Sequence, residues 1–129
     1  MKYLLDSNVL IHAVKGVGGV RKRMLAEKPG DLFISVITLA ELLYGTYRSS
    51  APEQARQRWL KVIKPLALLS FSEECAHFHA QIRYALRHRP IGERDLLIAS
   101  IALGYGLRLV THNSGEFERV AGLSWEDWY

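Results

Sequence analysis

The sequence predicts a single α/β domain, in which a parallel sheet of about four to five strands is flanked by helices on both faces. Short apolar runs alternate with longer segments of helical periodicity, which is the order typical of parallel sheets. The chain has 129 residues, 49% of them hydrophobic, and this suits one core of ordinary size. No internal repeat, linker or low-complexity segment interrupts it, so we expect one domain covering residues 1–129.

The first half of the chain favours two strands and four helices. Tyr3-Leu4-Leu5 is a short apolar run that ends at Asp6, as a buried strand would. The helical stripe after it stops at Gly16, and a second helix stops before Pro29-Gly30. We expect strands at 3–5 and 32–36, and helices at 7–14, 20–27, 38–47 and 52–63.

The second half continues the alternation. Glu73 and Glu74 follow Ser72, and Arg87 to Arg89 precede Pro90, so the charges of this segment complement a helix dipole. The next helix is strongly apolar and ends at Gly104 and Gly106. We expect strands at 66–69, 107–110 and 123–125, helices at 72–89 and 95–103, and a short turn at 116–119.

Composition narrows the function classes. The net charge of +4 and a pI near 9.4 favour polyanionic partners. No apolar run approaches the ~20 residues of a membrane helix, and Asp6 arrives too early for a signal peptide. Cys75 is the only cysteine, so no internal disulfide can form. We therefore expect a cytoplasmic protein with no membrane segment.

Four acids occupy equivalent places in this pattern. Asp6 and Glu116 come shortly after predicted strands, while Glu41 and Asp95 lie in the first turns of predicted helices. The carboxyl ends of parallel strands and the starts of the following helices share one edge of the sheet. Acids that are far apart in the sequence can therefore meet in one crevice.

Each acid also has a purely structural interpretation. Asp6 can cap a helix, Thr38-x-x-Glu41 has the pattern of a capping box, and the helix dipole favours Asp95. Glu116 can be a solvated loop charge. Together they are harder to explain, because two charges 4 Å apart repel by about 4 kcal/mol even at an effective dielectric near 20. A divalent cation removes that repulsion, and hard oxygen ligands select Mg²⁺ or Mn²⁺.

Four segments resemble the motifs of PIN-domain toxins of the VapC type, the ribonucleases of type II toxin–antitoxin systems. The segments are LLDSNVLI at 4–11, ISVITLAELLYG at 34–45, IGERDLLIA at 91–99 and LVTHN at 109–113. Residues 117–128 are similar to the C-terminal end of the same family. The resemblance covers essentially the whole chain in order, and it implies a PIN domain over residues 1–129.

The resemblance implies a metal-dependent endoribonuclease whose acidic pocket holds Mg²⁺ or Mn²⁺. By position, Asp6, Glu41 and Asp95 match the acids of the first three motifs. The fourth motif departs, because many relatives have Asp shortly after the Thr, whereas Thr111 is followed by His112 and Asn113. Either Glu116 or Asn113 would then supply the fourth ligand, and the number of metal ions stays open.

The roles that follow are specific. Asp6 and Asp95 would contact the metal, and Glu41 would bind metal or orient the attacking water. Ser7, Asn8, Thr111 and Asn113 would support these acids by hydrogen bonds. Five arginines either track RNA phosphates or form solvated helix faces. These are Arg21, Arg23, Arg87, Arg89 and Arg94.

Two alternatives and several partners remain open. A phosphohydrolase with Asp6 as nucleophile would need a lysine after a late strand, which is absent, and would leave Glu41 unexplained. A non-catalytic RNA-binding module would tolerate loss of the carboxylates. The toxin resemblance implies an RNA substrate (tRNA is one candidate), a cognate antitoxin that neutralises the toxin, and a homodimer.

Overall fold

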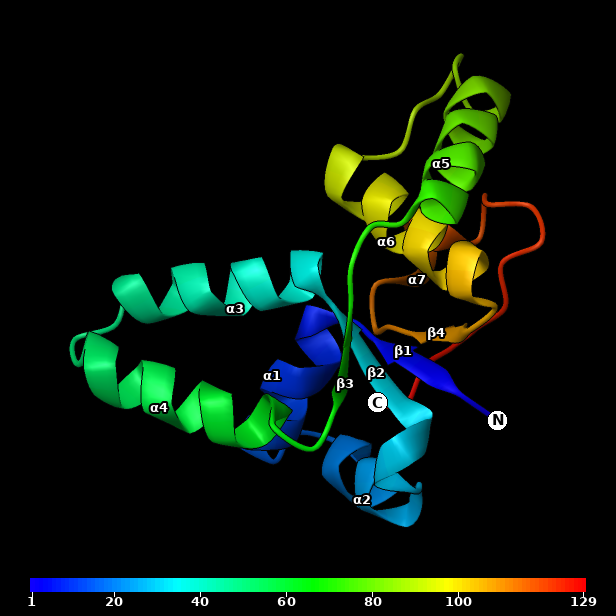
Figure 1. Ribbon diagram of the computed structural model, residues 1–129. Coiled ribbons are helices and arrows are strands. Elements are labelled where there is room, and N and C mark those ends of the chain that lie inside the picture. The colour runs from blue at the N-terminus through cyan, green and yellow to red at the C-terminus, as the bar shows by residue number, and fades with distance from the viewer.

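The computed structural model describes residues 1–129, and a five-stranded parallel sheet lies at its centre (Figure 1). The strand order is β3-β2-β1-β4-β5. The strands are β1 (Tyr3–Leu5), β2 (Leu32–Ser35), β3 (Ala67–Leu69), β4 (Arg108–Val110) and β5 (Trp125–Glu126). Tyr3 pairs with Leu32 on one side and Arg108 on the other, so β1 is the central strand. The predicted α/β class and the parallel sheet are confirmed.

Helices cover both faces of the sheet. They are α1 (Ser7–Lys15), α2 (Val20–Ala26), α3 (Val36–Tyr47), α4 (Pro52–Ile63), α5 (Glu73–Ala85), α6 (Glu93–Tyr105) and α7 (Ser114–Phe117), with a 3-10 turn at Pro29–Asp31. Alternate residues of a strand face opposite sides. Leu4 accordingly packs in the core under α5 and α6, while Leu5 packs in the core under α1 and α2. Both cores meet at the central strands.

The α3 and α4 helices form an antiparallel hairpin that extends away from the sheet (Figure 1). The α3 helix begins directly after β2, so its first turns lie at the carboxyl edge of the sheet. The α6 helix begins at Gly92 and Glu93 and packs along α5. One edge of the sheet therefore receives the starts of α1, α3 and α6.

The observed elements differ from the predicted ones mainly at their ends. The predicted helix 72–89 ends earlier, at Ala85, where the Leu86 amide donates to the Ile82 carbonyl and the Arg87 side chain binds the carbonyl of Tyr84 at 2.9 Å. The predicted turn 116–119 is the helix α7, shifted to 114–117. The last strand is real but shorter, at Trp125–Glu126. No helix has the length and apolarity that a membrane span requires.

Candidate active site

Asp6 lies at the centre of the carboxyl edge, directly after β1. Its side chain is 1% exposed and caps α1 by accepting a hydrogen bond from the Ser7 amide at 2.8 Å. Thr111, which follows β4, donates its hydroxyl to the second carboxylate oxygen at 2.9 Å. The capping role expected of Asp6 is therefore real. Capping uses one hydrogen bond of the carboxylate, which also contacts Thr111 and Arg94 from other elements at this edge of the sheet.

Glu41 reaches the same edge from the second turn of α3. The capping-box interpretation, with Thr38 as the cap, is wrong. The helix begins at Val36, and the Ser35 hydroxyl caps it by accepting from the Thr38 amide at 3.1 Å. Glu41 is thus released from capping, and its Oε1 atom is buried without a hydrogen-bond partner. A buried carboxylate oxygen without a donor is costly to the fold.

Asp95 and Glu116 lie together at the start of α6. Asp95 is 7% exposed in the first turn, and the carboxylate of Glu116 accepts from the Gly92 amide at 3.3 Å. Burial raises the pKa of Asp95, and contact with Glu116 raises it further against the opposing effect of Arg94. The same contact lowers the pKa of Glu116. The two carboxylates therefore crowd each other, and a proton on Asp95 relieves the crowding.

Arg94 is the residue that sequence reasoning misplaced. The sequence predicts for it an RNA-phosphate contact or a solvated helix face, yet its guanidinium lies among the predicted acids. It donates to Glu41 at 2.8 Å and to Asp95 at 2.7 Å, and it forms an ion pair with Asp6. Its Nη2 atom also donates to the Ser7 hydroxyl at 2.9 Å. One side chain thus joins acids that come from β1, α3 and α6.

The guanidinium of Arg94 stays protonated at the site. Burial alone would lower its pKa, but its hydrogen bonds to Glu41 and Asp6 outweigh burial and raise the pKa above the ordinary value. The missed signal is the start of α6 at Glu93, two residues before the predicted start. That shift puts Arg94 in the first turn beside Asp95 instead of in a loop.

The four residues expected to support the acids by hydrogen bonds differ in whether they contact an acid. Ser7 and Thr111 bond the acid cluster directly, as described. Asn8 accepts from the His112 amide at 3.2 Å, which holds the loop after β4. The Asn113 amide donates to the Thr111 hydroxyl at 3.1 Å, but the Asn113 side chain is exposed and bonds none of the acids. Of the two candidates for the fourth position, the structure brings Glu116 and not the Asn113 side chain to the cluster.

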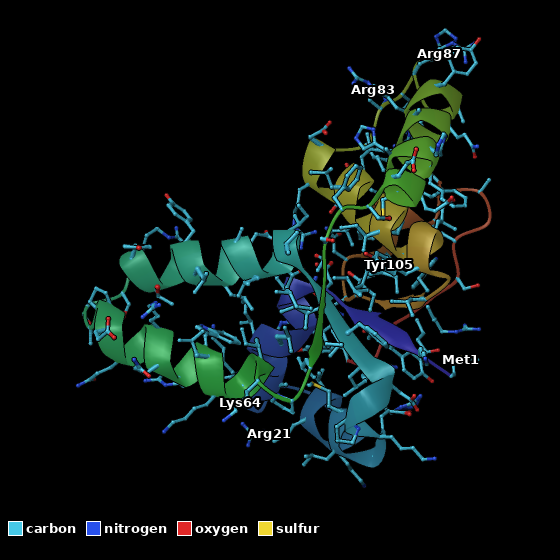
Figure 2. The ribbon with its side chains drawn as sticks, in the orientation of Figure 1. Met1, Arg21, Lys64, Arg83, Arg87 and Tyr105 are labelled. Carbon is cyan, nitrogen blue, oxygen red and sulfur yellow. The ribbon has the colours of Figure 1, made fainter.

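The other arginines lie outside the acid cluster. Arg21 binds the carbonyls of Ala13 and Val14 at the end of α1, and Arg23 pairs with Glu27 and Glu126. Arg87 extends from the free end of α5, as does Arg83 (Figure 2). Arg21 and Arg23 therefore have partners in other segments. Arg87 binds only Tyr84, three residues before it, and both Arg87 and Arg89 are exposed to solvent.

The chemistry of the cluster suits a divalent cation. Asp6, Glu41 and Asp95 carry three formal negative charges against one positive charge on Arg94, and Glu41 Oε1 is an acceptor without a donor. Carboxylate oxygens are the ligands that Mg²⁺ and Mn²⁺ prefer. No three such side chains lie close enough together to ligate one ion as they stand. The guanidinium of Arg94 lies between the three carboxylates.

The geometry gives no support to Asp6 as a nucleophile. One of its oxygens contacts Ser7 and Arg94, and the other accepts from Thr111. A carboxylate held on both oxygens is poorly placed to attack phosphorus. No lysine contacts it, in agreement with the sequence argument against a phosphohydrolase.

Comparisons with known proteins show the family of this chain. Residues 3–123 match the model of the PIN domain family. The chain is 37% identical to the tRNA(fMet)-specific endonuclease VapC of Shigella flexneri and 35% identical to Ribonuclease VapC2 of Rickettsia felis. Each alignment covers 99% of this chain and 98% of the relative.

Similar solved structures include VapBC complexes. One of them is VapBC2 from Rickettsia felis, bound to a DNA fragment from the promoter. A chain of that complex superposes on this one with a TM-score of 0.91 at 34% identity, and the alignment covers 100% of both chains. DNA-bound VapBC from Salmonella typhimurium gives 0.90 at 35% identity, covering 100% of this chain and 99% of that one.

Proposed function

Since this chain belongs to the PIN-domain family, and within it to the VapC ribonucleases, we propose that it hydrolyses RNA at the Asp6, Glu41 and Asp95 site with a bound Mg²⁺ or Mn²⁺ ion. A ribonuclease toxin restrained by an antitoxin is the function of this group. The metal and the residue roles are our proposal. The surplus of negative charge around Asp6 is the observation that carries it.

The side chains divide the work of the reaction. Asp6 and Asp95, both buried at the sheet edge, would hold the ion, with Thr111 and Ser7 fixing the Asp6 carboxylate. A bound divalent ion lowers the pKa of water and offsets charge on the phosphate. Glu41, whose Oε1 atom has no donor, would bind the ion or accept a proton from the attacking water. The water oxygen would add to phosphorus as the bond to the leaving oxygen breaks, and that oxygen would take a proton from solvent.

Glu116 completes the site in this proposal. Its carboxylate is held by the Gly92 amide and lies beside Asp95. That position suits a water-bridged ligand or a second ion. Two observations would separate these: the number of Mn²⁺ ions bound by the native chain, and the number bound by Glu116→Gln.

The partners are proposed from the relatives. The solved relatives are complexes named VapBC, so we propose a cognate antitoxin for this chain, encoded beside it, and a homodimer of the free toxin. The Shigella flexneri relative is named for tRNA(fMet), which makes initiator tRNA the RNA to try first. The cytoplasm, where RNA is found, is the proposed location.

The deciding experiment compares cleavage of purified small RNA by the native chain and by Asp6→Asn in Mg²⁺ or Mn²⁺. Asn keeps the shape and the capping oxygen but removes one charge. Asp31→Asn, in the 3-10 turn before β2, is the matched control. We expect discrete fragments from the native chain and Asp31→Asn only, and their loss on chelation.

Two results would overturn the proposal. Equal cleavage by Asp6→Asn would remove the acid site from the reaction. If all three proteins fold and bind RNA but none cuts, the chain is an RNA-binding module and its acids are structural. The fragment ends from an active protein identify the RNA and the bond that is cut.

A further inference from the structure

Arg94 presents a conflict within the proposed site. Its guanidinium uses oxygens of Asp6, Glu41 and Asp95, the same carboxylates that would ligate the ion. The guanidinium lies between these carboxylates, and no three of them are grouped closely enough to hold one ion as they stand. Arg94 and a divalent ion therefore cannot both occupy the centre of the cluster.

We propose that Arg94 belongs to the reaction site and has two successive partners: the three carboxylates before a divalent cation binds, and a phosphate of the RNA afterwards. The inference rests on the proposed metal-dependent cleavage. It adds a residue that both competes with the ion and receives the substrate.

The first half of this proposal follows from charge. The guanidinium brings one positive charge to three negative ones, whereas Mg²⁺ or Mn²⁺ brings two to the same oxygens. A cation at the centre would also repel Arg94 at a distance of a few ångströms, which drives the guanidinium outwards. Arg94 is thus a counter-ion that holds the acids together and makes metal binding weaker than the acids alone would make it.

The second half follows from position. Arg94 is attached to the first turn of α6, immediately before Asp95, so its displaced head stays at the rim of the site. Its side chain is 32% exposed and can reach solvent. A phosphodiester delivered to the acids arrives at that rim, and the guanidinium fork binds phosphate oxygens in pairs.

A purely structural role makes the opposite prediction. If Arg94 only ties β1, α3 and α6 together, its removal should loosen the acids and weaken metal binding. If it competes with the ion, its removal should tighten metal binding. The sign of one measurement therefore separates the two roles.

The measurement is Mn²⁺ binding without RNA, read from the electron paramagnetic resonance of free Mn²⁺. Four proteins are compared: the native chain, Arg94→Gln, Arg94→Lys, and Arg58→Gln, which removes the same charge from the exposed face of α4. We expect Arg94→Gln to bind at least about tenfold more tightly than native, because the competing charge is gone. Arg94→Lys should lie between them, and Arg58→Gln should match native. Equal or weaker binding by Arg94→Gln would overturn the proposal.

A measurement on the native chain covers the case in which Arg94→Gln does not fold. The Nε resonance of Arg94, assigned by its absence in Arg94→Lys, is followed by nuclear magnetic resonance while Mg²⁺ is added. We expect it to shift as the site saturates. A site that saturates while this resonance stays unchanged contradicts displacement of Arg94.

The phosphate contact is tested by cleavage of small RNA at saturating Mn²⁺. We expect Arg94→Gln to lower kcat/KM by about tenfold or more, mainly through KM, with partial rescue in Arg94→Lys. A loss no greater than that of Arg58→Gln would overturn the phosphate role. If the native chain neither binds Mn²⁺ nor cuts RNA, the proposed function itself fails. If it does both and Arg94→Gln is unchanged, only this inference fails.

Discussion

Two arginines of this molecule lie among carboxylates, and their surroundings differ. Arg23 of α2 pairs with Glu27 at 3.1 Å and Glu126 at 3.3 Å, and its guanidinium stacks over the Trp128 ring at 4.8 Å. Arg94 contacts acids from three elements, and no aromatic ring packs on it. The Arg23 guanidinium thus packs on an aromatic ring in addition to its ion pairs, whereas Arg94 contacts only polar and charged groups.

The charge balance separates the clusters further. Arg108 lies 3.5 Å from Glu126, so the Arg23 cluster has two cations for two acids. Arg94 is one cation in contact with three acids, a formal surplus of two negative charges, and Glu116 beside Asp95 adds a fourth acid. A network that serves only the fold has no need of such a surplus. A divalent ion at this site would offset two of these negative charges.

The buried atoms left without partners point the same way. In the Arg23 cluster the atom is a donor, Arg23 Nε, and in the Arg94 cluster it is an acceptor, Glu41 Oε1. A leftover donor cannot bind a cation, whereas a leftover carboxylate oxygen can. Two clusters of similar composition therefore differ in what they are able to bind.

The largest effect expected from this comparison is on RNA cleavage, with Glu41→Gln set against Glu126→Gln. Both changes remove one acid from an arginine cluster and keep its shape. We expect Glu41→Gln to lower both Mn²⁺ affinity and cleavage by about 100-fold or more, because the ion loses a charged ligand. Glu126→Gln should keep both within about twofold. Similar losses in the two variants would show that the clusters are equivalent and would break the comparison.

The next largest effect is expected at Thr111, which is fully buried and donates to Asp6 at 2.9 Å. Thr111→Val removes that donor without changing the volume much. We expect a loss of about 10–100-fold in metal affinity or cleavage, since the carboxylate is no longer oriented. Thr111→Ser keeps the hydroxyl and should stay near native. Isothermal titration with Mn²⁺ measures the affinities, and native affinity in Thr111→Val would remove this residue from the site.

The contrast between these clusters also shows what the sequence can predict. The sequence predicts the positions of Asp6 and Thr111 because each directly follows a strand, and that of Asp95 because it lies in the first turn of a helix. The element order and the parallel sheet followed from the alternation of apolar runs with helical stripes. These features depend on local pattern, and a local pattern is visible in the sequence.

The features that failed depend on where a helix begins. Thr38 and Glu41 fit a capping box, but Ser35 lies three residues earlier and caps the helix. The sequence predicts for Arg94 either an RNA-phosphate contact or a solvated helix face, whereas the side chain lies among the acids in the first turn of α6. A shift of two residues turns a side chain by about 200° around a helix, so a small error in the start misplaces a charged group. The contacts among Arg94, Asp6 and Glu41 join positions up to 88 residues apart, which periodicity cannot predict.

A smaller effect is expected when the balanced cluster is broken. Arg23→Ala removes the two ion pairs and the stacking on Trp128. We expect the free energy of unfolding to fall by about 1–2 kcal/mol, equally with and without Mg²⁺. The neighbouring exposed Lys22→Ala should change it by less than about 0.5 kcal/mol. Urea unfolding measures both, and a loss for Arg23→Ala that depends on Mg²⁺ would assign metal chemistry to the wrong cluster.

The smallest effect concerns the stability of the Arg94 cluster without divalent ions, with Asp95→Asn as the probe. Burial and contact with Glu116 raise the pKa of Asp95 above its ordinary value of 3.8. A carboxyl group with a raised pKa in the folded state stabilises the fold while it is protonated, and that contribution is lost as the pH rises through the raised value. Asn cannot ionise, so the variant avoids this loss.

We therefore expect native and Asp95→Asn to have similar Tm values near about pH 4, and Asp95→Asn to become a few degrees more stable as the pH approaches about 7 in chelator. Excess Mg²⁺ should reverse the order, because only the native carboxylate binds the ion and binding stabilises the folded state. A native chain that is the more stable at neutral pH in chelator would mean that Arg94 alone balances its acids. The two arginine clusters would then be alike, and the case for a cation in one of them would rest on activity alone.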